Sequence, residues 1–256
     1  MKILLVDCSP KRKLSTSAYL LSVFSAQITG EKEKIKLLPK NYDLICKGMQ
    51  KADAVVFAMP IYVDGVPASV LRFFEYFQNF CGENNFPPVK VYAIVNCGFY
   101  EGKQTKTCHR IIENWCNRCG LRYMGGIGQG AGEMIGVIRF VNPFIAIVGS
   151  LIQFIIYAVT SAGQFSFAEA LHSIGFINIA VNIGLFFVFN TFMYIATFRL
   201  AKACRHAQSV PVIYSTVFCP RFLFVIFADL FWIIKALLRG VPVWSLKDRP
   251  ADRTDK

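Results

Sequence analysis

Apolar runs of strand length alternate with amphipathic stretches of helical period over the first 135 residues of the chain. The apolar runs predict strands at residues 1–7, 35–38, 54–59, 89–95 and 123–127. Helical spacing of apolar side chains predicts helices at residues 42–51, 68–80 and 105–119, and a further helix directly after the first strand. Strand and helix in strict alternation are typical of α/β proteins. We therefore expect a doubly wound, five-stranded parallel sheet with helices on both faces.

The loops that leave the carboxyl ends of the strands are the expected place for a ligand. Three of these loops follow Asp7, Met59 and Val95. The first is rich in hydroxyls and cations, and it leads at once into a helix. Unpaired N–H groups at a helix N-terminus, together with such side chains, favour a bound phosphate. A simple Ser or Thr helix cap is the alternative, and this segment alone leaves both interpretations open.

Taken together, the three loops resemble those of the flavodoxin-like NAD(P)H-dependent FMN reductase family. Its members share a Ser-Pro-Arg-x-x-Ser-like phosphate loop, a Pro-x-Tyr loop and a Gly-containing loop, which residues 9–17, 60–67 and 96–102 match here. The resemblance covers about residues 1–135. The chain departs from the pattern at Cys8, where glycine is usual, and at Lys11, where arginine is usual.

The resemblance implies that FMN is the cofactor and that NAD(P)H is the electron donor. The residues to which it assigns FMN binding are Ser9, Lys11, Arg12, Ser15, Thr16, Ser17, Pro60, Ile61, Tyr62, Val63, Asp64, Asn96, Cys97, Gly98 and Tyr100. No catalytic side chain is assigned, because a flavin carries the redox chemistry itself. Tyr62 offers an aromatic face for the flavin ring, and Gly98 allows close approach of the backbone. A packing role for Tyr62, and an ordinary strand end at Asn96 and Cys97, are the alternatives.

Cysteine and histidine side chains suggest a rival site within the expected helix at residues 105–119. Cys108 and His109 lie two turns before Cys116 and Cys119, so the four side chains do not converge on one ion, and we expect no metal site. A redox CxxC motif normally opens a helix, whereas this one lies late in its helix. The nine cysteines are an odd number, which favours reduced thiols over a disulfide framework.

The second half of the chain is strongly apolar. From residue 140 to residue 198 the only formal charge is on Glu169, and the runs 140–160 and 174–198 have the length of transmembrane helices. We therefore predict a transmembrane helical hairpin within a membrane region at residues 136–208. A pair of buried core helices is the alternative, and a chain this short has difficulty burying two such runs.

The distribution of cations predicts the orientation of this hairpin. Arg139 precedes the first run and Arg199 follows the second, whereas the connection between them has no Lys or Arg. By the positive-inside rule, both ends face the cytoplasm. We therefore expect a protein of the cell membrane whose domain at residues 1–135 lies in the cytoplasm.

The apolar segment 212–239 differs because it carries four charges, and its cations fall within a narrow helical sector. This pattern predicts an amphipathic helix at the membrane surface, within a segment at residues 209–244. A third transmembrane span is the alternative, but it would export the cations of the charged tail at residues 245–256.

The net charge of +12 suits an anionic lipid surface, and the sequence has no nucleic-acid recognition motif. The expected partners are membrane lipid and either a quinone or a membrane redox partner. A homodimer is implied by the resemblance. The sequence thus predicts a membrane-attached flavoprotein that uses FMN and NAD(P)H to reduce a quinone, a flavin or another acceptor. A non-enzymatic FMN-binding electron carrier or membrane interaction module is the alternative. A transporter or channel element is less favoured, because neither apolar run contains a charge.

Overall fold

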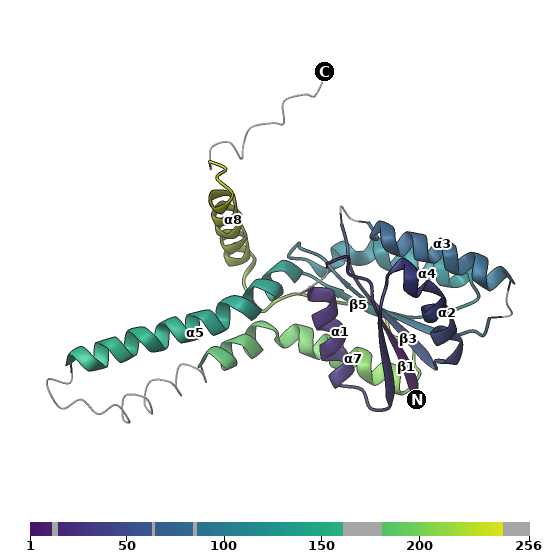
Figure 1. The fold of residues 1–256 in the computed structure, drawn as a ribbon. Helices are drawn as coiled ribbons and strands as arrows, with labels where there is room; N and C mark the ends of the chain where they lie inside the picture. The colour runs from purple at the N-terminus through teal and green to yellow at the C-terminus, as the bar shows by residue number, and fades with distance from the viewer. Residues whose placement is uncertain (12–14, 63–64, 84–85, 161–180, 243–256) are drawn as a thin grey trace, which may run out of the picture. The chain divides into compact units, whose positions relative to one another are not determined.

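The computed structural model describes residues 1–11, 15–62, 65–83, 86–160 and 181–242 (Figure 1). The chain forms two compact units, Met1–Phe218 and Cys219–Lys256. These limits differ from the boundaries at residues 135, 208 and 244 that the composition of the chain suggests.

The first unit is built on a six-stranded sheet in which every pair of neighbours is parallel, in the order β2-β1-β3-β4-β5-β6. The strands are β1 (Lys2–Asp7), β2 (Glu31–Lys36), β3 (Ala54–Pro60), β4 (Lys90–Asn96), β5 (Arg122–Gln129) and β6 (Ile213–Ser215). The predicted parallel sheet is confirmed, and the order of its first five strands is the flavodoxin-like one. The predicted number of strands is wrong. β6, whose residues were expected inside the amphipathic helix at 212–239, pairs with β5 through Ile127, Gly128 and Gln129.

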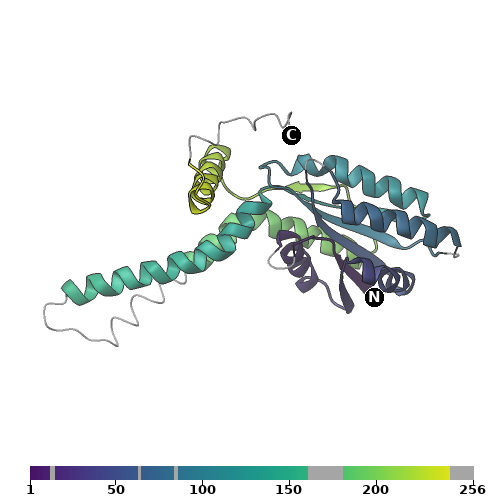
Figure 2. The same ribbon diagram turned by 45° about the horizontal axis from the view of Figure 1, so that its top comes forward.

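Helices cover both faces of this sheet (Figure 2). Three helices share one core cluster with the sheet, namely α2 (Tyr42–Lys51), α3 (Ala68–Glu83) and α4 (Lys106–Arg118). α1 (Thr16–Ala26) and α7 (Thr191–Arg205) contact each other and the opposite face. Short 3-10 turns occur at Pro39–Asn41 and Gly102–Thr105. Because both faces are covered, every residue of β3 is buried, which explains its continuous apolar run.

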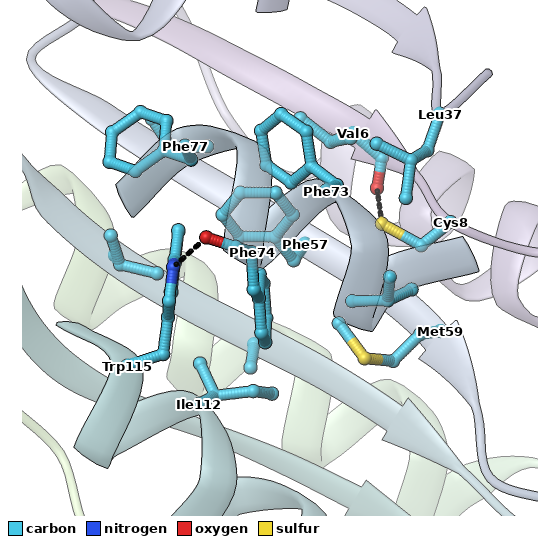
Figure 3. Close-up of a cluster of buried hydrophobic side chains, with 14 of the residues drawn as sticks. Val6, Cys8, Leu37, Phe57, Met59, Phe73, Phe74, Phe77, Ile112 and Trp115 are labelled. Carbon is cyan, nitrogen blue, oxygen red and sulfur yellow. Dashed lines mark hydrogen bonds between the residues drawn. The ribbon is translucent and has the colours of Figure 1, made fainter. Parts of the chain in front are cut away.

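An aromatic cluster fills the space between α3, α4 and the sheet (Figure 3). The Trp115 ring is stacked on Phe74, with ring centroids 4.1 Å apart, and it lies edge-on to Phe57 at 5.7 Å and to Phe77 at 5.2 Å. Its indole N–H donates to the carbonyl oxygen of Phe74 at 3.2 Å. Trp115 is 3% exposed, so this side chain joins two helices and a central strand in one core.

The predicted second transmembrane run, residues 174–198, ends inside α7. From Thr191 onward this segment is a covering helix of the sheet, in which Met193, Ala196 and Thr197 are buried. The hydroxyl of Tyr194 lies 3.1 Å from that of Tyr19 on α1. A helix packed on a sheet and a helix in lipid both need an apolar surface, so the sequence pattern did not separate them.

The described part of the chain contains no single helix that is long and apolar enough to cross a membrane. Val181–Phe189 and Thr191–Arg205 reach the required length and composition only as a pair, with a bend of 59° between them. The predicted transmembrane hairpin is therefore not found there. Residues 174–180 of the predicted second run lie outside the described residues.

The connection from β5 to α7 begins with α5 (Gly132–Thr160). α5 starts against α1, because the Thr16 hydroxyl donates to the carbonyl oxygen of Gly132 at 2.8 Å and the Arg139 guanidinium lies 4.0 Å from the centre of the Tyr19 ring. Further along α5, four apolar side chains spaced by four residues are each more than half exposed: Ile147, Leu151, Ile155 and Val159. α5 therefore carries an apolar stripe, which is defined by these four residues.

The second unit contains α8 (Arg221–Leu238), which begins nine residues later than the predicted helix at 212. Apolar side chains spaced by four residues are again half exposed or nearly so: Phe222, Ile226, Leu230, Ile234 and Leu238. The Lys235 ammonium lies 5.0 Å from the centre of the Trp232 ring. α8 thus combines a cation beside an indole with a second apolar stripe.

Candidate functional site at the carboxyl edge of the sheet

The loops after β1, β3 and β4 meet in one pocket at the carboxyl edge of the sheet. Strand order reverses between β1 and β3, so the pocket lies at the switch point of the topology. Its lining residues are Ser9, Lys11, Ser15, Thr16, Ser17, Pro60, Ile61, Tyr62, Asn96, Gly98 and Glu133. All but Glu133 belong to the three loops selected from the sequence.

Two described residues of the predicted site, Cys97 and Tyr100, do not line this pocket. Arg12, Val63 and Asp64 lie outside the described residues. Cys97 is buried, and its thiol donates toward the carbonyl oxygens of Phe99 and Glu101, each 3.6 Å away. The carbonyl oxygen of Tyr100 accepts a hydrogen bond from the Thr216 hydroxyl at 2.6 Å. Cys97 has the contacts of an ordinary strand end.

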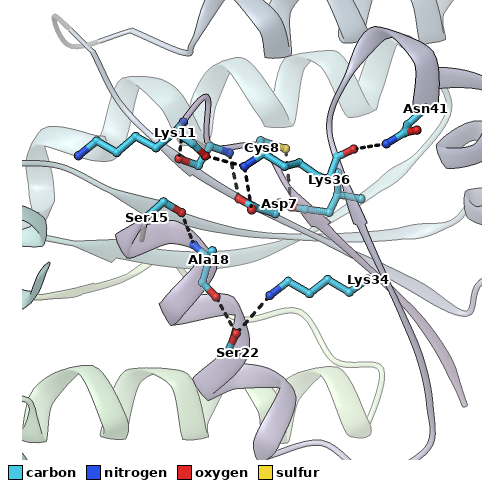
Figure 4. A network of polar contacts seen from close by, with 11 residues as sticks. Asp7, Cys8, Lys11, Ser15, Ala18, Ser22, Lys34, Lys36 and Asn41 are labelled. Atoms are coloured by element: carbon cyan, nitrogen blue, oxygen red, sulfur yellow. Dashed lines mark hydrogen bonds and ion pairs between the residues drawn. The ribbon is translucent and has the colours of Figure 1, made fainter. Parts of the chain in front are cut away.

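Asp7 and Lys36 fix the start of the first loop (Figure 4). One carboxylate oxygen of Asp7 accepts from the backbone N–H of Ser9 at 3.1 Å, and the other lies 3.7 Å from the Lys36 ammonium. Lys36 also donates to the carbonyl oxygen of Lys11 at 2.6 Å. These contacts hold Ser9 and Lys11 at the pocket. The place of Asp7 at the end of a buried strand is the one signal of this role in the sequence.

The helix-cap interpretation of this loop holds for Ser15. Its hydroxyl oxygen accepts from the backbone N–H of Ala18 at 3.0 Å, and its backbone is extended, as in an N-cap. The N–H groups of the first turn of α1 have no intrahelical acceptors, and Thr16 and Ser17 of this turn line the pocket. A cap and an anion site are therefore compatible in this loop.

The next two hydroxyls connect α1 to the neighbouring elements. Ser17 is 1% exposed and donates to the side-chain oxygen of Asn96 at the end of β4, over 2.6 Å. Thr16 donates to Gly132 at the start of α5. Three elements that are far apart in the sequence therefore share one wall of the pocket.

The second loop presents an aromatic ring at the rim. Tyr62 is 45% exposed, although it lies next to buried Pro60 and Ile61. Its backbone exchanges two hydrogen bonds of 3.0 Å with Gly65, which close a tight loop. This exposure argues against the packing role for Tyr62 and leaves its ring available to a planar ligand.

Close approach of the backbone occurs at Gly132, and Gly98 has more room than expected. A Cβ atom added at Gly98 would come no closer than 3.8 Å to Glu133. One added at Gly132 would lie 2.8 Å from the side-chain nitrogen of Asn96 and 2.9 Å from the carbonyl oxygen of Cys97. The glycine that this site requires is thus at the start of α5.

Glu133 is the lining residue that the sequence reasoning missed. Its carboxylate lies 3.1 Å from the Lys11 ammonium, and the two side chains are 60% and 49% exposed. Glu133 lies in the first turn of α5, where an acidic side chain is favoured by the helix dipole. Lys11 of the first loop and Lys36 at the end of β2 are thus each close to a carboxylate.

His109, a candidate ligand in the rival metal site, has two partners in the core. Its Nδ1 lies 2.7 Å from the Tyr123 hydroxyl, and its Nε2 lies 3.1 Å from the carbonyl oxygen of Ile127. A neutral ring that donates from Nε2 and accepts at Nδ1 satisfies both contacts. Burial lowers the pKa of His109 from 6.5 to about 4, although the bond to Ile127 opposes this shift.

Stability should therefore fall on acidification. The unfolded chain protonates His109 below about pH 6.5, whereas the folded chain resists protonation until about pH 4. The stabilisation is complete above pH 6.5 and is lost between pH 6.5 and 4, up to about 3 kcal/mol. We expect His109→Gln to flatten the dependence of thermal unfolding on pH in this range. His206→Gln, at an exposed position, is the matched control, and an equal slope in both variants would contradict the assignment of this dependence to His109.

The described sheet order and pocket define the class of protein, an α/β protein of flavodoxin-like topology with a candidate anion site at its switch point. No family model and no curated protein matches the chain. Solved structures that resemble it include the Trp repressor binding protein from Bacillus subtilis, at 17% identity and a TM-score of 0.43, over 49% of this chain and 84% of that one. Another is the NAD(P)H:quinone oxidoreductase from Methanothermobacter marburgensis, at 15% identity and a TM-score of 0.42, over 54% and 92%.

A third similar structure is general stress protein 14 from Treponema denticola, which was solved in complex with FMN. It is 16% identical, with a TM-score of 0.41, over 49% of this chain and 84% of that one. At these identities and TM-scores we transfer no activity from the three proteins. The functional argument rests on the residues of the pocket.

Proposed function

We propose that the chain is an FMN-binding oxidoreductase that takes electrons from NAD(P)H and passes them to a quinone, a flavin or another acceptor. One observation carries the proposal. Three loops that are separate in the sequence, and that were selected for this cofactor, line a single pocket at the switch point of a parallel sheet.

The residues of the pocket suit the parts of FMN. The hydroxyls of Ser9 and Ser15, the Lys11 ammonium and the N-terminus of α1 offer donors and positive charge to a phosphate. The exposed ring of Tyr62 offers a face to the flavin, and Asn96 adds a buried polar strand end that is hydrogen-bonded to Ser17. Bound FMN supplies the redox chemistry, since a flavin accepts a hydride. The tasks of the protein are to hold the phosphate and to orient the ring.

We further propose that the protein is attached to the cell membrane, with the sheet domain on the cytoplasmic side, where NAD(P)H is found. The apolar stripes of α5 and α8 support this proposal, because extended exposed apolar surfaces are typical of lipid or protein contacts. The net charge of +12 suits an anionic membrane surface. A quinone or a membrane redox partner would be reached from this position, and a homodimer would cover the exposed Tyr62 ring.

Membrane attachment predicts that the purified chain floats with vesicles of neutral and anionic phospholipid in a density gradient. Leu151→Asp combined with Leu230→Asp should sharply reduce the floating fraction, because each change places a charge in the middle of an apolar stripe. Leu44→Asp is the matched control, since Leu44 is 51% exposed on α2, outside both stripes. Flotation that the double variant leaves intact would contradict attachment through these stripes.

The proposed cofactor is tested by titrating FMN into the purified full-length chain and following the quenching of flavin fluorescence. Saturable quenching supports the proposal, and its absence at high protein concentration overturns it. Anaerobic NADPH or NADH is then added to the complex. Loss of the flavin absorbance near 450 nm (an approximate value for bound flavins) identifies a reductase. Binding without this loss identifies an FMN-binding electron carrier, the second candidate.

A further inference from the structure

We propose that Glu133 is a specificity-determining residue of this pocket. Its carboxylate competes with the phosphate of a flavin nucleotide for the Lys11 ammonium, and this competition lowers the preference of the pocket for FMN over riboflavin. The inference rests on the proposed function, because it concerns which flavin the same site selects.

The Glu133 carboxylate occupies a position beside the one described cation of the pocket. It lies 3.1 Å from the Lys11 ammonium, in a pocket otherwise lined near this pair by serine and threonine hydroxyls. Lys11 is the described cation that lines the pocket. A carboxylate and a phosphate oxygen are similar acceptors for an ammonium group. Glu133 therefore makes the contact with Lys11 that the phosphate of a bound nucleotide would make.

The backbone that carries Glu133 is anchored in this position. The N–H of Gly132 donates to the carbonyl oxygen of Cys97 at 2.7 Å, and the carbonyl of Gly132 accepts from Thr16. The preceding residue, Ala131, is buried and has a positive φ of 55°, a backbone conformation that a side chain rarely adopts. α5 therefore starts at a fixed point at the edge of the pocket. The side chain of Glu133 is 60% exposed, so it can turn away from Lys11.

The consequence for ligands is electrostatic. A phosphate monoester carries close to two negative charges at neutral pH, and it would enter a site where Lys11 already has an anionic partner. Either Glu133 gives up its ion pair or two anions share one ammonium, and each result lowers the affinity for FMN. Riboflavin has no phosphate, so it meets neither effect. The other nearby carboxylate, that of Asp7, is 9% exposed and holds the loop through Ser9 and Lys36, so it is not free to compete.

A structural role for Glu133 gives a different expectation. An acidic residue in the first turn of α5 stabilises the helix through its dipole, and its loss would then alter the stability of the protein. Such a change would affect the binding of FMN and riboflavin alike. The ratio of the two dissociation constants therefore separates the two roles.

The test uses Glu133→Gln, which keeps the shape of the side chain and removes its charge. Glu113→Gln, at an exposed position on α4, is the matched control. FMN and riboflavin are titrated into the wild-type chain and both variants at low salt, with flavin fluorescence as the readout. We expect Glu133→Gln to bind FMN about 10-fold tighter and riboflavin within about twofold of the wild type. The control should change neither constant.

An unchanged or reduced preference of Glu133→Gln for FMN, with both flavins still bound, would overturn this inference and leave the proposed function standing. Binding of neither flavin by any of the three proteins would overturn both. Should the Gln variant fail to fold, Glu133→Ala provides the same comparison and the same criterion.

Discussion

Replacing Ser15 by Asp is expected to weaken FMN binding about 100-fold, or about 2.7 kcal/mol, while the fold stays intact. Ser15 lines the pocket and is 5% exposed, so the new carboxylate would face the phosphate with little solvent between them. Two like charges about 4 Å apart near a protein surface repel by about 4 kcal/mol. The fold should survive because Asp caps a helix as well as Ser does, and the bond from the N–H of Ala18 is kept.

Ser15→Asn is the control for this experiment, because Asn also caps a helix but adds no charge. Fluorescence titration should give an FMN dissociation constant for Ser15→Asn within a few-fold of the wild type. Thermal unfolding should show all three proteins folded. Equal affinities for FMN in the Asp and Asn variants would mean that the phosphate does not bind beside Ser15.

Replacing Trp115 by Ala is expected to destabilise the protein by about 3–5 kcal/mol. The indole contacts Phe57, Phe74 and Phe77, and it satisfies a carbonyl oxygen of α3. Its loss opens a cavity between two helices and the central strand, and that cavity cannot collapse without moving α4. A loss of this size is a large part of the stability of a typical domain.

Urea denaturation followed by circular dichroism measures this change. Leu71→Ala is the control on α3, the helix against which Trp115 packs, since Leu71 is 41% exposed and should change the free energy of unfolding by less than about 0.5 kcal/mol. A loss below about 1 kcal/mol for Trp115→Ala would show that the aromatic cluster is not the core of this domain.

The sheet was predictable from the sequence because its central strands are buried on both faces. The run at residues 54–59 differs from β3 by one residue, and the strand at residues 123–127 lies within β5. The sixth strand was not predictable. It has three residues, and they lie at the start of the apolar segment 212–239, for which the sequence predicts a helix.

α7 could not be assigned from the sequence for a related reason. The buried surface of α7 faces α1 and the sheet. The first residues of α7 also continue a charge-free run that has the hydropathy of a transmembrane helix. Burial in a protein core and burial in lipid impose the same composition on a helix. The packing of Tyr194 against Tyr19 is the observation that separates them, and it joins residues 175 positions apart.

The site was predictable where it follows strand ends and was missed where it depends on distant residues. The order of elements brings the loops at Ser9, Pro60 and Asn96 to one edge, as the topology of parallel sheets requires. Glu133 lies 122 positions from Lys11, in a helix start that had no motif to single it out. The tighter packing of Gly132 than of Gly98 was also not predictable, because steric room depends on neighbours distant in the sequence.

The most direct test of the central claim is a crystal structure of the full-length chain with FMN. We expect the phosphate at the N-terminus of α1, within about 3 Å of donors from Ser9, Ser15 or Lys11. We also expect the flavin ring to lie against Tyr62, at the carboxyl edge of β3 and β4. A flavin bound elsewhere, with this pocket empty at saturating FMN, would contradict the account.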